Sequence, residues 1–202
     1  MTASTTSQPS ASSSASTSAS DAVSAAAAAA SAASAASVTG ERADLLAALA
    51  QARHFLRYTT RDLTDEQAAT RTTASVLCLG GLIKHVASSE ANWTRFIVEG
   101  PASMQYSEEV IAQWSEEFRM QPGETLAGVL DHYAEIARRT DELIATLPDL
   151  DASHPLPEAP WFAPGARWSA RRALLAIVAE TTQHAGHADI IRESLDGAKS
   201  MG

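Results

Sequence analysis

One stretch near the C-terminus decides the fold and the chemistry of this chain: Glu180-Thr-Thr-Gln-His184-Ala-Gly-His187-Ala-Asp-Ile-Ile-Arg192. An α-helix turns about 100° per residue, so Glu180, His184 and His187 fall within one narrow arc, at relative angles of about 0°, 40° and −20°. The same arc carries the apolar stripe of the helix: Ala173, Ile177, Ile191 and Leu195. Polar side chains on a core-facing stripe cost free energy unless they have partners, and a bound metal ion is one such partner.

Four long segments have the apolar periodicity of amphipathic helices. They are Glu41–Tyr58, Leu79–Glu99, Leu126–Leu147 and Ala170–Leu195. The sequence between and around them contains no alternating β-branched pattern that would indicate strands. The chain is therefore predicted to be all-α, with the long helices packed as a four-helix bundle.

Shorter elements are expected between the long helices. Thr64-Asp-Glu-Gln67 is a capping box and predicts a short helix. Another short helix is predicted from Ser107 through Phe118, with acidic residues in its first turn. Asp149–Arg167 contains four prolines, which predicts a loop, and its Trp161 and Phe162 indicate that this loop packs onto the bundle.

The first 40 residues differ in composition from the rest of the 202-residue chain. They are almost entirely Ala, Ser and Thr, and such a segment buries too little apolar surface to offset its ordering entropy. We expect a disordered tail over residues 1–40 and a single bundle domain over residues 41–202. The run Ala25–Ala30 is far too short to span a bilayer.

Charge and cysteine content narrow the classes of partner and compartment. The formal net charge is −9, which argues against non-specific nucleic-acid binding and against an anionic membrane surface as a partner. No Lys or Arg precedes Arg42, so the basic start of a signal peptide is missing. Cys78 is the only cysteine, which fits a reducing compartment. These features predict a cytoplasmic protein, and a homodimer through helix faces is compatible with them.

His85 is the candidate partner for the C-terminal stretch. It lies in the second long helix on a face of small and apolar residues, and should therefore point inward. Metal sites in helical bundles are built from inward side chains on facing helices. His85 could join either Glu180 with His184, or His184 with His187, in a three-ligand site with an open position. That pattern is typical of catalytic zinc, although nickel, iron and manganese accept the same ligand types.

The same residues also have a purely structural interpretation. An inward histidine such as His85 is often a hydrogen-bonded core residue. Glu180 and His184, four positions apart, could simply bond each other. The spacing alone leaves both interpretations open.

Two segments of the chain, around His85 and around Glu180, resemble a known family. Leu79-Gly-Gly-Leu-Ile-Lys-His85, followed by Glu90 and Trp93, resembles the second helix of the DinB-like superfamily. The segment from Glu180 to Gly197 resembles its last helix. Over about Glu41 to Gly197 the chain is most similar to the branch of actinobacterial mycothiol-dependent S-transferases.

The resemblance implies a four-helix bundle whose divalent metal is held by His85, Glu180 and His184. Many relatives carry His-x3-His where this chain has Glu180 and His184, so the pair of His184 with His187 remains a competitor. From its place in the polar trio of the last helix, we expect a catalytic role for His187, as a substitute ligand or as a base beside the metal. Close relatives tend to carry a histidine one turn before the Glu, where this chain has Ala176.

The implied function is a metal-dependent transferase that activates a low-molecular-weight thiol of the mycothiol type for attack on an electrophilic small molecule. Asn92 and Arg192 are candidate contacts for this cosubstrate, although Arg192 could instead pair with Asp189. Glu90 could contact a metal ligand or be a surface carboxylate. Two alternatives remain: a stress-associated metal-binding module without turnover, and a metal-dependent isomerase or hydrolase on the same site.

Overall fold

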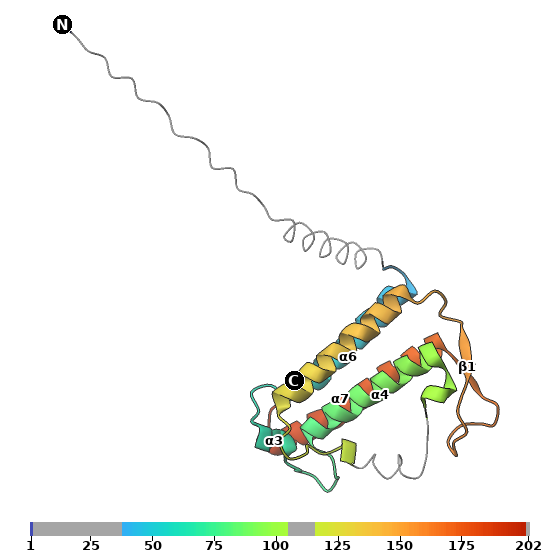
Figure 1. Cartoon of the computed structure of the whole chain (residues 1–202). Helices are drawn as coiled ribbons and strands as arrows, with labels where there is room; N and C mark the ends of the chain where they lie inside the picture. Colours follow the sequence, from blue (N-terminus) through green and yellow to red (C-terminus); the bar gives the residue numbers. More distant parts are fainter. Residues whose placement is uncertain (2–37, 105–115, 201–202) are drawn as a thin grey trace. The chain divides into compact units, whose positions relative to one another are not determined.

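The computed structural model describes residues 38–104 and 116–200, together with Met1. Its four long helices are α2 (Glu41–Tyr58), α4 (Leu79–Glu99), α6 (Leu126–Thr146) and α7 (Ala170–Asp196). They pack into a bundle in which α7 lies between α2 and α4, and α4 also packs against α6. Figure 1 shows α4, α6 and α7 running alongside one another. The predicted all-α four-helix bundle is confirmed, and the predicted bounds of the long helices are right to within one residue.

Side-chain caps explain where the helices begin. The capping box is formed at α3 (Asp65–Ala69), where the Thr64 hydroxyl accepts from the Gln67 amide and the Gln67 side chain accepts from the Thr64 amide. At the start of α6 the Thr125 hydroxyl accepts from the Gly128 amide, and at the start of α7 the Ser169 hydroxyl accepts from the Arg172 amide. At the other end of α7, Gly197 has a φ of 80°, a left-handed conformation that glycine adopts without strain.

The structure differs from the prediction over 149–167 and describes only the end of the helix predicted over 107–118. The stretch 149–167, predicted as a loop, holds β1 (Ser153–Pro155), which pairs antiparallel with β2 (Arg167–Ser169). That part of the prediction was wrong, because strands of three residues are too short to show an alternating pattern. Most of the helix predicted over 107–118 lies outside the described residues, as does most of the predicted disordered tail, residues 2–37. Glu116 and Glu117, at the end of that segment, are helical.

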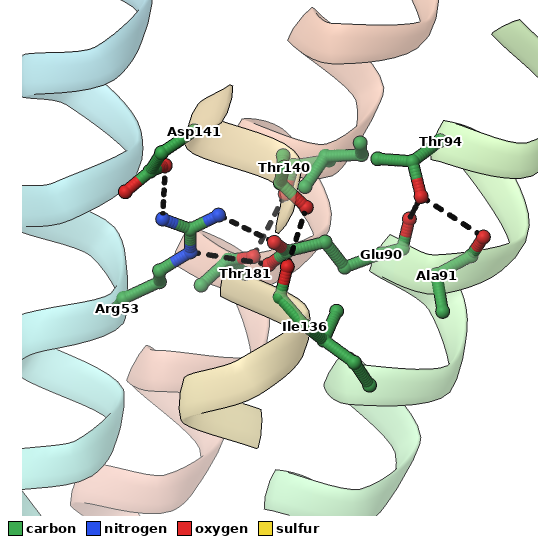
Figure 2. A network of polar contacts seen from close by, with 9 residues as sticks. Arg53, Glu90, Ala91, Thr94, Ile136, Thr140, Asp141 and Thr181 are labelled. Atoms are coloured by element: carbon green, nitrogen blue, oxygen red, sulfur yellow. Dashed lines mark hydrogen bonds and ion pairs between the residues drawn. The ribbon is translucent and has the colours of Figure 1, made fainter. Parts of the chain in front are cut away.

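A buried polar layer divides the bundle core into two apolar clusters. One cluster includes Leu49, Phe96 and Ile177, and the other includes Leu56, Val86 and Ala185. Between them the Arg53 guanidinium binds the fully buried Glu90 carboxylate and donates to Asp141 Oδ1 at 2.7 Å. Figure 2 shows Arg53 reaching both acids, with Thr140 and Thr181 beside them. All four long helices thus contribute to this layer.

Glu90 therefore has neither of the roles considered from sequence. It is not on the surface, because its side chain is 0% exposed. Its carboxylate accepts from Arg53 rather than contacting a candidate metal ligand, with Arg53 Nε 3.2 Å from Glu90 Oε2. Within the described ranges, no helix is long and apolar enough to cross a membrane.

Candidate metal centre

Three side chains from α4 and α7 converge on one point. Glu180 Oε1 lies 3.0 Å from His85 Nε2 and 3.2 Å from His184 Nε2. Each of the three residues offers a ligand atom within 4.8 Å of the other two. In the part of the chain that the structure describes, this is the one group of three His, Cys, Asp or Glu side chains with such geometry.

The helix register explains this arrangement. Glu180 and His184 are one turn apart on α7, so their side chains stack along the helix surface. Thr181 and Ala185, the next residue in each case, are buried against the bundle and fix the rotation of α7. On the facing helix, Leu82, Ile83 and Val86 are buried around His85 in the same way. His85 and His184 are left only 19% and 12% exposed, and Glu180 33%.

The electrostatics of the group favour an ionised carboxylate. Hydrogen bonds from His184 and then from His85 hold the pKa of Glu180 well below its usual range, against the opposing effect of burial. For His85, burial disfavours the charged imidazole. The hydrogen bonds to Glu117 and Glu180 outweigh that effect, so the pKa of His85 is raised. Two imidazoles therefore gather around one negatively charged oxygen.

The donor set fits a divalent cation. Two imidazole nitrogens and one carboxylate oxygen are ligands that zinc binds at about 2.0–2.2 Å, and three protein ligands leave a position open for a substrate. Iron, nickel and manganese accept the same atoms. Replacing the two hydrogen bonds to Glu180 Oε1 by metal–ligand bonds needs no change of helix register, because the three atoms already face one another.

His187 lies on the other side of His184. Its Nδ1 is 3.3 Å from His184 Nδ1, whereas His184 Nε2 faces Glu180. The structure therefore brings His187 against the outer nitrogen of a candidate ligand and does not bring it into the convergent group. Such contacts orient a ligand imidazole and fix its tautomer.

A pocket of about 900 Å³ opens beside the three residues. His85 and Glu180 lie in its wall. The other lining residues include several polar and aromatic side chains: Ser89, Asn92, Trp93, Glu117, Phe118, Trp161 and Phe162. Trp161, on the connection between β1 and β2, is 49% exposed. The candidate centre is therefore accessible to a small molecule.

The two residues predicted to contact a cosubstrate behave differently. Asn92 lines the pocket, where its Oδ1 accepts from the Arg95 guanidinium at 3.0 Å. Arg192 is buried and does not line the pocket. Its Nη1 donates to the carbonyls of Thr59 and Arg61 at 2.8 and 2.7 Å, and its Nε donates to Asp196 at 2.9 Å. The pairing of Arg192 with Asp189 that the sequence suggested is not formed, because Asp189 accepts from the Ser200 amide instead.

Sequence reasoning missed Glu117 and Phe118. Glu117 Oε2 lies 3.4 Å from His85 Nδ1, and the Phe118 ring stacks on the His85 ring with a centroid distance of 4.1 Å. The available signal was the pair Gly80-Gly81, one turn before His85. Glycines inside a helix are costly and often mark a close backbone approach.

Two solved structures share the fold of this chain. The chain is similar to YfiT from Bacillus subtilis, with 19% identity, a TM-score of 0.56, and coverage of 77% of this chain and 89% of that one. YfiT is described as a probable metal-dependent hydrolase with an unusual four-helix bundle topology. A conserved protein from Enterococcus faecalis matches at 13% identity and a TM-score of 0.56, covering 80% of this chain and 100% of that one.

At these identities the two structures support the fold alone. No curated protein matches the chain. The family model described as mycothiol-S-transferase matches residues 44–197, which include all four long helices almost entirely. This match over more than half of the chain shows that it belongs to the mycothiol S-transferase family.

Proposed function

We propose that this protein is a divalent-metal-dependent transferase that joins a mycothiol-type thiol to an electrophilic small molecule. The metal ligands in this proposal are His85, Glu180 and His184. One observation carries the proposal: in a chain of this family, two imidazole nitrogens and a carboxylate oxygen converge at the wall of a pocket large enough for small molecules. Zinc is the ion we favour, because a three-ligand site with an open position is typical of catalytic zinc.

The residues of the chain have distinct parts in this chemistry. Glu180 supplies the negative charge that holds a cation, since its carboxyl stays ionised. His187 contacts His184 Nδ1 and orients that imidazole. The polar pocket residues Ser89 and Asn92 offer hydrogen bonds to a hydroxyl-rich thiol, and the aromatic rings of Trp93 and Phe162 offer apolar surface to the electrophile.

A divalent cation, when bound, lowers the pKa of a coordinating thiol and so makes the nucleophile available at neutral pH. In the transfer, the thiol proton is lost to solvent and the sulfur lone pair forms a bond to the electrophilic carbon. The leaving group departs with the electron pair of the broken bond. A reducing cytoplasm would keep both the thiol and Cys78 reduced.

The test combines metal content with turnover. We expect protein purified without chelator to carry close to one equivalent of metal and to conjugate mycothiol with a haloacetamide. His184→Ala should lose both properties. His132→Ala is the matched control, because His132 is exposed on α6 and has no contact with the three residues.

Other outcomes separate the alternatives. Metal binding without conjugation would favour the module without turnover. Hydrolysis of an ester or amide in the absence of thiol would favour the hydrolase. Protein that takes up no divalent ion, even when zinc is supplied in excess, would overturn the proposal.

A further inference from the structure

Two adjacent glycines in α4 form a notch for a chain segment that is distant in sequence. A Cβ atom added at Gly81 would lie 1.9 Å from the Phe118 carbonyl oxygen, and one added at Gly80 would lie 2.3 Å from Met120 Sδ. The contact at Gly81 is with backbone and excludes a side chain there, whereas at Gly80 the flexible Met120 side chain would have to move. Helix formation does not explain this pair, because glycine has a lower helix propensity than alanine. The backbone of Phe118 rests directly on α4 because Gly81 has no side chain.

Further contacts attach the same segment to α4. The Lys84 ammonium donates to the Arg119 carbonyl at 2.9 Å and pairs with Glu124 at 2.7 Å. Cys78 Sγ lies 3.5 Å from the Phe118 carbonyl oxygen. Segment 117–120 is therefore held at several points along the first two turns of α4, immediately before His85.

The result is that both Glu117 and Phe118 touch the His85 ring. Phe118 stacks on one face, with an interplanar angle of 27°. Glu117 Oε2 lies 3.4 Å from Nδ1, while Nε2 faces Glu180 at 3.0 Å. The two ring nitrogens thus have different partners: Nε2 contacts Glu180 in the convergent group, and Nδ1 contacts Glu117.

We propose that Glu117 is a positioning residue for His85, delivered to the ring by the glycine notch. The inference rests on the proposed metal centre. A histidine that binds a cation through Nε2 carries its proton on Nδ1, and Glu117 accepts that hydrogen bond. Carboxylates in this place fix the tautomer and the ring orientation of the ligand, and removing them costs about 10–100-fold in metal affinity. Gly81 acts indirectly, because its contact with the Phe118 backbone sets the position of the segment that bears Glu117.

The test measures zinc affinity by chelator competition on metal-free protein. We expect Glu117→Ala to bind zinc about 10–100-fold more weakly, with an unchanged Tm of the metal-free protein. Glu117→Gln should lose less, because the amide oxygen still accepts a hydrogen bond. Glu116→Ala is the matched control, since Glu116 is the neighbouring carboxylate and pairs with Arg119 instead of His85.

The notch is tested by Gly81→Ala, with Gly186→Ala as its control because a methyl at Gly186 meets no atom within 4 Å. We expect Gly81→Ala to weaken zinc binding and the Gly81→Ala/Glu117→Ala pair to be little worse than Glu117→Ala alone. A second readout is the exchange rate of the His85 Nδ1 proton in zinc-loaded protein, measured by NMR. Loss of Glu117 should accelerate it, and a merely structural role would not.

The outcomes are separable from those of the metal centre itself. If wild type binds zinc and Glu117→Ala binds it within twofold as tightly, this inference is wrong and the metal centre stands. If wild type binds no divalent ion, both are wrong. Should Gly81→Ala fail to fold, the Glu117 variants still decide, because Glu117 is one-third exposed and its removal leaves the notch intact.

Discussion

Helix α4 carries two polar side chains that face the bundle five residues apart, and they belong to different kinds of cluster. Glu90 is fully buried and lies against the Arg53 guanidinium, which also reaches Asp141. His85 is part-exposed and faces Glu180, which lies between it and His184. The first cluster joins opposite charges between the two apolar clusters of the core, with its Asp141 half-exposed. The second cluster brings two imidazole nitrogens and one carboxylate oxygen, all of them possible metal ligands, together at the wall of a pocket.

The difference shows which buried polar groups point to chemistry. In the layer of Arg53 and Glu90 each charge meets its complement, so the cluster is complete without a ligand. Around Glu180, two imidazoles compete for one carboxylate oxygen, and both can turn a lone pair toward a cation. Burial and polarity are common to both clusters. What distinguishes a candidate site is the convergence of electron donors together with access from outside.

The largest expected effect comes from removing one charge from the cluster of Arg53, Glu90 and Asp141. Glu90→Ala leaves the Arg53 charge buried without its main partner, and we expect it to lower the free energy of unfolding by about 3–5 kcal/mol. Urea denaturation of the metal-free protein measures this change. The folded fraction should still bind zinc normally, since Glu90 makes no contact with the three candidate ligands.

A double variant sharpens that result. Arg53→Met/Glu90→Leu removes both charges and keeps the core filled, so its stability should be close to that of wild type or higher. A loss as large as that of Glu90→Ala would mean that the layer contributes through its hydrogen bonds rather than through charge balance.

The next effect separates the two clusters by ligand. Zinc that binds only the folded state at 100 times its dissociation constant should stabilise wild type by about 2.7 kcal/mol. Thermal unfolding with and without zinc measures the gain. We expect His85→Ala to show none and Arg53→Met/Glu90→Leu to show all of it. An equal gain in His85→Ala would place the bound zinc elsewhere in the chain.

A smaller effect on zinc affinity is expected beside the cluster of His85, Glu180 and His184. His187→Ala removes the partner of His184 Nδ1 but leaves the three candidate ligands in place. We expect a loss of about tenfold in zinc affinity, with stoichiometric binding retained. Chelator competition gives the affinity. Complete loss of the metal would instead identify His187 as a ligand, which is the alternative pair that the sequence left open.

Most of the fold was predictable because it depends on local signals. Apolar periodicity marked the four long helices, and Thr64, Ser169 and Gly197 marked helix ends through caps that involve only nearby residues. The hairpin was missed because its three-residue strands are stabilised by pairing between distant positions, such as His154 with Trp168. Pairing of this kind leaves no periodic trace in either strand.

The candidate site was predictable in part for the same reason. Glu180 and His184 share a helix face, which spacing reveals, and the small and apolar face around His85 indicated that it points inward. Glu117 and the partners of Arg192 were not accessible in this way. Glu117 reaches His85 through a backbone contact between Phe118 and Gly81, and Arg192 binds carbonyls more than 130 positions away. Such contacts are set by the tertiary structure alone.

The smallest predicted effect concerns cosubstrate binding in the pocket that His85 and Glu180 line. Asn92 lines it and offers its amide, whereas Arg192, the other residue that sequence suggested for cosubstrate binding, is held by the carbonyls of Thr59 and Arg61. Asn92→Ala should therefore weaken binding of mycothiol to zinc-loaded protein by the value of one hydrogen bond, about 0.5–1.5 kcal/mol. Calorimetric titration measures this loss, and Gln183→Ala, on the exposed surface of α7, is the control. Equal affinity in Asn92→Ala and wild type would show that the thiol lies along another wall of the pocket.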